Sequence, residues 1–293
     1  MFPVQTKRIL FTMARSAKVR IGKVSSNKIK STRRALELQL RLMHLRTVIR
    51  IFTLATFIAI IDLTLASISH AGIGTQQLLV ASARSWTSET GTLQRFSKSS
   101  GKWIAEGKAI RVVFGSGLAW GVGLDRHVNS GPQKMEGDKR SPAGIFWLGP
   151  AFGYAAEPPG GSLFPYRQTN DNDYFVDDPE SASYNRWLRL KNNEDPHKLF
   201  RSAEKMKWAD GVYELGVVVH HNMSPTLRRR GSAIFLHIWR GPDKPTVGCT
   251  AMSKSDLAMM LGWLDPQKQP LLVQAPANEL PGLLAQISVT LPQ

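Results

Sequence analysis

Residues 232–250 read Ser232-Ala-Ile-Phe-Leu-His-Ile-Trp-Arg-Gly-Pro-Asp-Lys-Pro-Thr-Val-Gly-Cys-Thr250. The first eight residues are almost continuously apolar, which predicts a strand that is mostly covered on both faces. Side chains alternate along a strand, so every second residue from Ala233 to Trp239, including His237, shares one face. The loop that follows is long enough to return the chain toward this face. We therefore expect Cys249 to lie beside His237.

Cys249 is the only cysteine of the chain, so it cannot form an internal disulfide. It is a buried inert thiol, an intermolecular link or a nucleophile. A thiol becomes nucleophilic when a neighbouring base or cation favours the thiolate, and His237 and Arg240 are the candidates for this role. Gly248 permits close approach of a substrate to the backbone, so the N–H groups of Gly248 and Cys249 are candidates for binding the oxyanion. Thr250 and Arg240 are further candidates for binding the substrate. The alternative is that Cys249 and His237 are core residues.

The rest of the chain from residue 91 onward predicts a mainly β domain with one or two short helices. Ser253 and Asp256 form a capping box, which predicts a helix that ends before Asp265-Pro266. Residues 151–200 are rich in Pro, Gly, Asn and Asp, and a loop of this length commonly covers or lines a site. Alternating or apolar runs predict strands at 92–97, 102–106, 109–114, 145–148, 212–219, 232–239 and 271–273.

The net charge of +16 is unevenly distributed along the 293 residues. Residues 1–71 hold 13 of the 38 basic residues and only two acidic ones, which leaves the remainder with 25 basic and 20 acidic residues. This mildly basic body argues against a nucleic-acid partner and suits an anionic polymer such as cell wall.

The N-terminal region predicts export. Residues 51–61 are apolar and uncharged, Arg46 and Arg50 precede them, and Ser69-His-Ala71 provides small residues for a signal peptidase. We interpret 43–71 as a signal peptide, with an uncleaved signal anchor as the alternative and the only membrane contact. Translation from Met43 would give a signal peptide of ordinary length, which would make the basic extension 1–42 a mis-assigned start.

Three blocks of the sequence resemble the catalytic domain of the L,D-transpeptidases, the YkuD-like family. They are His237 with Gly248-Cys-Thr250, the segment Arg140-Ser-Pro-Ala-Gly-Ile-Phe146, and Leu148-Gly-Pro-Ala-Phe-Gly153. The resemblance covers roughly residues 90–275 and implies a β-sandwich-like catalytic domain over 91–275. A lead-in at 72–90 and a C-terminal tail at 276–293 would flank it.

The resemblance also implies a reaction and a location. In this family the cysteine attacks the bond between an L-centre and a D-centre in a peptidoglycan stem peptide and forms a thioester, while the histidine acts as base and then acid. Cys249 and His237 stand at the matching positions. We therefore expect an exported monomer, periplasmic or associated with the cell wall, that acts on peptidoglycan stem peptides. Many members carry an arginine just after the cysteine, where this chain has Thr250-Ala251, so Arg240 is the candidate to replace that charge.

Two alternatives remain from the sequence: a cysteine hydrolase of wall cross-links, and a wall-binding module without turnover. No cofactor or metal is expected. His220 and His221 are adjacent, so on a regular strand they would point to opposite faces and could not bind one ion together.

Overall fold

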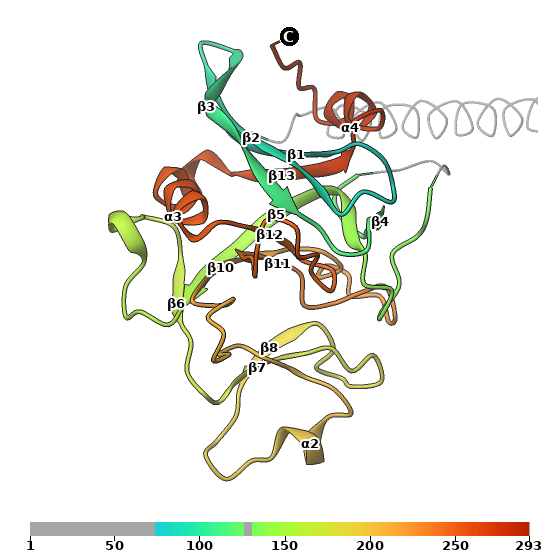
Figure 1. Ribbon diagram of the computed structural model, residues 1–293, viewed down its shortest axis with the longest axis vertical. Helices are drawn as coiled ribbons and strands as arrows, with labels where there is room; N and C mark the ends of the chain where they lie inside the picture. Colours follow the sequence, from blue (N-terminus) through green and yellow to red (C-terminus); the bar gives the residue numbers. More distant parts are fainter. Residues whose placement is uncertain (1–73, 126–130, 293) are drawn as a thin grey trace, which may run out of the picture. The chain divides into compact units, whose positions relative to one another are not determined.

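The computed structural model of the protein describes residues 74–125 and 131–292 (Figure 1). The predicted basic extension and signal segment lie outside these residues. None of the helices in the described part is both long and apolar enough to cross a lipid bilayer.

The described residues fold into a mainly β domain, as the sequence predicts. Its strands are β1 (Gln77–Ala83), β2 (Thr90–Ser99), β3 (Lys102–Val113), β4 (Leu118–Trp120), β5 (Ser141–Gly153), β6 (Tyr166–Gln168), β7 (Asp173–Val176), β8 (Arg186–Arg189), β9 (Glu204–Lys205), β10 (Leu215–Val219), β11 (Phe235–Ile238), β12 (Thr250–Met252) and β13 (Leu271–Pro276). Its helices are α2 (Pro196–Leu199), α3 (Lys254–Trp263) and α4 (Leu280–Gln286), with short 3-10 turns at Pro159–Gly161 and Pro266–Lys268.

The main sheet closes on itself through β5. Its strand order is β10-β11-β12-β3-β2-β1-β13-β5, and β5 also pairs with β10. The thirteen residues of β5 make both contacts, with Phe146 opposite Leu272 of β13 and Phe152 opposite Gly216 of β10. A Cβ at Gly216 would lie 2.3 Å from the Phe152 ring, so only glycine fits at this point of closure.

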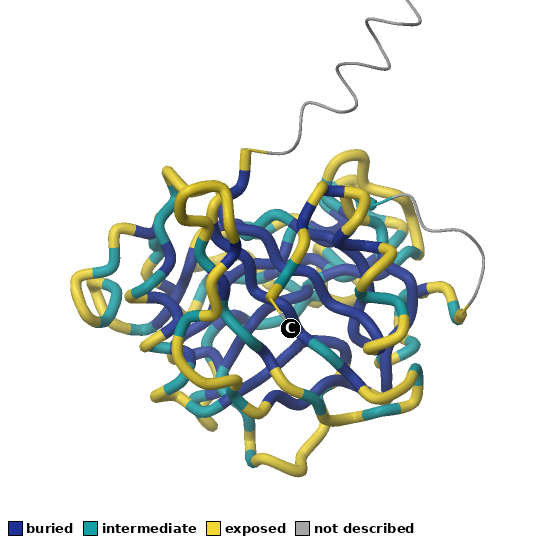
Figure 2. Tube along the Cα trace, turned by 90° about the horizontal axis from the view of Figure 1, so that it is seen from above, coloured by how far each residue is buried: buried dark blue, intermediate teal, exposed yellow. Residues whose placement is uncertain are grey.

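A continuous apolar core fills the inside of this sheet. Figure 2 shows the buried strands in the interior and exposed loops around them. Helix α3 contributes Leu257, Met260 and Leu261 to this core. The predicted cap is confirmed, because the Ser253 hydroxyl accepts from the Asp256 N–H at 3.1 Å and donates to its carboxylate at 2.6 Å.

The core extends beyond the expected domain limits on both sides. Strand β1 lies in the expected lead-in, yet it pairs with β2 and β13 and is almost completely buried. Helix α4 lies in the expected tail and buries Leu283 and Leu284. The folded unit therefore includes packed elements on both sides of the predicted domain. The apolar run of β1 is short, and α4 has only seven residues, so neither has a strong periodic signal.

The two strands predicted at 102–106 and 109–114 are one strand, β3. Gly107 has a φ of +66°, and the pairing with β2 shifts register between Leu93 and Arg95. The Gln94 side chain donates to the carbonyls of Glu106 and Gly107, at 3.1 and 3.3 Å. The glycine thus marks a bulge inside a strand rather than a turn between two strands.

The segment 151–200 is more regular than its composition suggests. With β9 it forms a second, three-stranded sheet in the order β8-β7-β9, which Figure 1 shows at the opposite end of the domain from α4. Asp173 anchors it: the fully buried carboxylate accepts from Arg189 at 2.6 Å, from Arg167 at 2.8 Å and from the Trp187 indole at 3.0 Å. The strand pattern is masked in the sequence because these strands have only two to four residues.

A second apolar cluster packs the small sheet against the main sheet. Phe175 of β7 and Phe152 of β5 pack edge-to-face on Phe235 of β11, with ring centroids 5.2 and 5.3 Å apart. Cys249 belongs to the same cluster. Ile234 and Leu236 belong to the first cluster, so the predicted alternation along this strand is confirmed.

Candidate active site

The turn that ends at Cys249 is held by two hydroxyl groups. The Cys249 carbonyl accepts from Ser141 Oγ at 2.7 Å and from Thr246 Oγ1 at 2.6 Å. Ser141 Oγ in turn accepts from the Gly115 N–H at 2.9 Å. Gly248 has a φ of +138°, a conformation that favours glycine. Contacts from distant parts of the chain therefore fix the backbone that presents the thiol.

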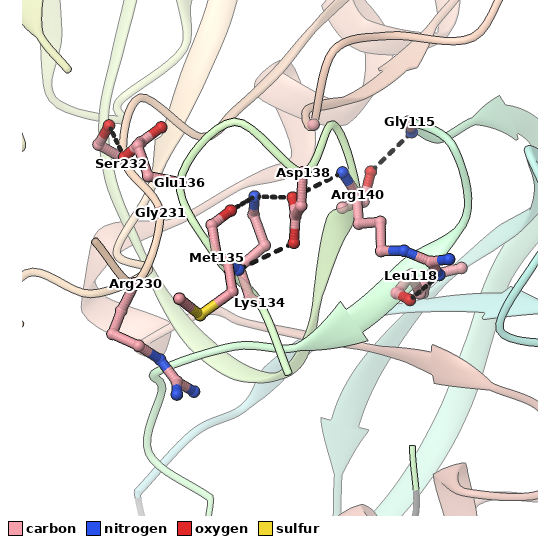
Figure 3. Close-up of polar contacts among 12 residues, drawn as sticks. Gly115, Leu118, Lys134, Met135, Glu136, Asp138, Arg140, Arg230, Gly231 and Ser232 are labelled. Carbon is pink, nitrogen blue, oxygen red and sulfur yellow. Dashed lines mark hydrogen bonds and ion pairs between the residues drawn. The ribbon is translucent and has the colours of Figure 1, made fainter. Parts of the chain in front are cut away.

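Polar contacts among Lys134, Met135, Asp138 and Arg140 hold the loop that precedes β5 (Figure 3). Lys134 is buried and forms an ion pair with Asp138, and its ammonium also donates to the Met135 carbonyl at 2.9 Å. The Asp138 carboxylate accepts from the Met135 and Arg140 N–H groups at 2.8 and 2.9 Å. This ion pair, with Lys134 buried and Asp138 partly buried, restrains the path of the loop, which then enters β5 at Ser141.

The thiol of Cys249 is shielded. Its side chain lies in the second apolar cluster, and the residue is only 7% exposed. Sγ accepts from the Phe235 N–H at 3.3 Å and donates to the Ala233 carbonyl at 3.5 Å. Burial raises the pKa of Cys249 to about 12. The expectation that neighbouring groups lower the thiol pKa is therefore wrong for this conformation.

His237 is buried on β11 beside the edge of the Tyr213 ring, with ring centroids 5.2 Å apart. Burial lowers the pKa of His237 to about 4, so the imidazole is neutral near pH 7. Its Nδ1 lies 2.8 Å from the Ile238 carbonyl and donates to it, which leaves the lone pair of Nε2 to accept a proton. His237 and Cys249 form no hydrogen bond with each other in this structure.

Both side chains nevertheless line one pocket of about 190 Å³. Trp208 and Val247 are exposed at this pocket, and Tyr213 is buried in its wall. The complete lining is Glu204, Trp208, Val212, Tyr213, His237, Trp239, Arg240, Lys244, Pro245, Thr246, Val247 and Cys249. The pocket is thus a mainly apolar cleft in which a thiol, an imidazole and a few charged groups converge.

The sequence profile of the L,D-transpeptidase catalytic domain (YkuD) matches residues 97–273, more than half of the chain.

The chain belongs to the L,D-transpeptidase catalytic-domain family.

Other comparisons add little to this assignment. No curated protein matches the chain significantly. Two solved structures of the helical cell shape determining protein Pgp2 from Campylobacter jejuni, one of them a point mutant, align at 13% identity with a TM-score of 0.31. They cover 70% and 72% of this chain, whereas the chain covers only 48% and 53% of them. Such a likeness carries no argument about function.

The remaining predicted residues of this L,D-transpeptidase domain take different positions. The Gly248 N–H donates to Thr246 Oγ1 at 3.1 Å, so it is already occupied. The Thr250 hydroxyl is buried and donates to the Gln274 side chain at 2.7 Å, away from the pocket. Arg240 does line the pocket, where it is ion-paired with Asp210 at 2.6 Å.

Glu204, Trp208 and Tyr213 form a hydrogen-bonded group in the pocket wall that was not predicted from the sequence. Tyr213 packs edge-to-face with His237, and its hydroxyl donates to Glu204 at 3.0 Å. Trp208 donates to the same carboxylate oxygen at 3.2 Å. All three lie between β8 and β10, where no motif marks them. His221, by contrast, is structural: it is buried and accepts from the Val122 N–H at 3.2 Å. No group of three potential metal ligands occurs among the described residues.

Proposed function

We propose that this protein transfers acyl groups between peptidoglycan stem peptides through a thioester on Cys249. The carrying observation is that Cys249 and His237 line one pocket within the matched catalytic domain. Their pKa values, raised for the thiol and lowered for the imidazole, support a neutral resting pair rather than a preformed thiolate.

In this mechanism the substrate displaces the thiol from its bond with the Ala233 carbonyl. His237 Nε2 takes the thiol proton as Sγ attacks the carbonyl carbon between the L-centre and the D-centre. The same proton then passes to the departing amine, and a thioester remains on Cys249. The Ile238 carbonyl, which accepts from Nδ1, keeps the imidazole in the required tautomer and stabilises its protonated form.

The second half of the reaction decides between transferase and hydrolase. An amine of a neighbouring stem gives a new cross-link, and water gives hydrolysis. The mainly apolar lining and the low exposure of Cys249 favour transfer, because they limit access of water to the thioester. This chemistry agrees with an exported, periplasmic or cell-wall-associated protein.

The test is covalent labelling of the purified protein. We expect a carbapenem, which acylates nucleophiles of this kind, to add one adduct to the wild-type protein in an intact-mass measurement and none to Cys249→Ala. His237→Ala should acylate at least about a hundredfold more slowly, as expected for loss of a general base. A folded wild-type protein without an adduct would instead support the wall-binding module.

A further inference from the structure

A carboxylate lies on the wall of the pocket that holds Cys249. Glu204 comes from β9, which pairs with β7 of the small sheet. One of its oxygens accepts from the Tyr213 hydroxyl at 3.0 Å and from the Trp208 indole at 3.2 Å. Both donors are neutral, so they orient the carboxylate and leave its charge in place.

No Lys or Arg within the described part of the chain forms an ion pair with Glu204. Arg240 and Lys244 line the same pocket, but Arg240 is ion-paired with Asp210 at 2.6 Å and neither forms an ion pair with Glu204. Burial raises the pKa of Glu204 and the charge of Asp177 adds to that rise, while the hydrogen bonds from Tyr213 and Trp208 and the charge of Arg240 oppose it only in part. A carboxylate in this setting gains most from a ligand that brings a positive charge.

The proposed transfer reaction has one reactant of this kind. An acceptor amine is an ammonium ion near pH 7, since alkyl ammonium groups have a pKa of about 10. It must lose a proton before its nitrogen can attack a thioester. His237 alone cannot easily accept both protons that the acceptor nitrogen loses. One proton must leave before the attack, and the second leaves as the C–N bond forms.

We propose that Glu204 binds the acceptor as its ammonium ion and takes its first proton, and this inference rests on the proposed function. The ammonium and the carboxylate become a free amine and a carboxylic acid. The amine nitrogen then attacks the thioester carbon, the C–N bond forms and the C–S bond breaks. His237 takes the second proton and passes it to the Cys249 sulfur, and Glu204 releases its proton to solvent.

The test compares two nucleophiles. Full-length protein is acylated with a synthetic tetrapeptide stem and offered cadaverine, which is cationic at neutral pH, or hydroxylamine, which is mostly uncharged there. We expect Glu204→Gln to lower kcat/KM for cadaverine by about tenfold or more, the factor that about 1.4 kcal/mol represents, and to leave transfer to hydroxylamine unchanged. Glu89→Gln removes the same charge from an exposed site and should change neither rate.

The outcomes separate this inference from the proposed function. If Glu204→Gln lowers kcat/KM equally for both nucleophiles, or for neither, Glu204 is only a structural acceptor for Tyr213 and Trp208. That result would overturn the inference and leave the proposed function standing. Absence of an acyl adduct on the wild-type protein would overturn the proposed function and the inference with it. Selective loss with cadaverine, together with normal formation of the adduct, supports the assignment.

Discussion

Replacing Ser141 by alanine tests whether the turn that ends at Cys249 is held as the structure shows. The fully buried hydroxyl donates to the Cys249 carbonyl and accepts from the Gly115 N–H. Ser141→Ala leaves that N–H buried without a partner, at a cost of about 1–3 kcal/mol. The Cys249 carbonyl keeps Thr246 as a donor, so its loss is one hydrogen bond, about 1 kcal/mol. Together these losses lower the free energy of unfolding by about 2–4 kcal/mol.

Urea unfolding followed by tryptophan fluorescence measures this change. We expect a lower midpoint with an unchanged slope, because the surface exposed on unfolding stays the same. Ser99→Ala, an exposed serine at the end of β2, is the matched control and should shift stability by less than about 0.5 kcal/mol. The folded variant should also acylate more slowly, since one of two restraints on the turn is gone. Equal midpoints for the two variants would refute this account of the turn.

Two further substitutions probe the small sheet and Gly248, which precedes Cys249. Burial alone would raise the pKa of Asp173, but hydrogen bonds from Arg189 and other donors outweigh it and lower the pKa. The ionised Asp173 carboxylate therefore stabilises the fold above its unfolded pKa of about 3.9, and this stabilisation is lost as the pH falls below that value. Asp173→Asn should lower the free energy of unfolding by about 1–3 kcal/mol at pH 7. In thermal melts at several pH values, the variant should also lose less stability than the wild type as the pH is lowered. Gly248→Ala places a side chain on a residue with a φ of +138°, which costs about 1–3 kcal/mol of backbone strain. The variant should form the covalent adduct more slowly in the intact-mass measurement. An unchanged rate would show that the position does not require glycine.

Elements with strong local signals could be predicted from the sequence. The capping box at Ser253 marks the start of α3, and the alternation along 232–239 places Phe235 and Ile234 in different apolar clusters. Both signals arise within a few neighbouring residues, so they need no knowledge of the tertiary fold. The same holds for Leu271–Val273, which lies inside β13.

The environment of the candidate site could not be predicted in this way. The pKa of Cys249 is raised because the thiol is buried, and the apolar cluster that buries it includes Tyr213 and Phe175 of the small sheet. The strands of this sheet are very short, so the sequence gives little sign of them. The partners of Ser141 lie 26 and 108 residues away along the chain, and no local pattern encodes such contacts. The sequence therefore predicted that Cys249 and His237 lie close together, and both line one pocket, but it indicated the wrong direction for the thiol pKa.

The place of β13 in the sheet sets an order on the assembly of the domain. This strand, near the C-terminal end of the described chain, lies between β1 and β5 and is paired with both. Until residues 271–276 arrive, β1 and β5 each present an open edge, and such edges invite pairing between molecules. A chain truncated before Leu271 should therefore associate with its own copies rather than fold. Because β13 closes the edges of two strands and is synthesised late, the chain is most prone to aggregation before β13 has been made.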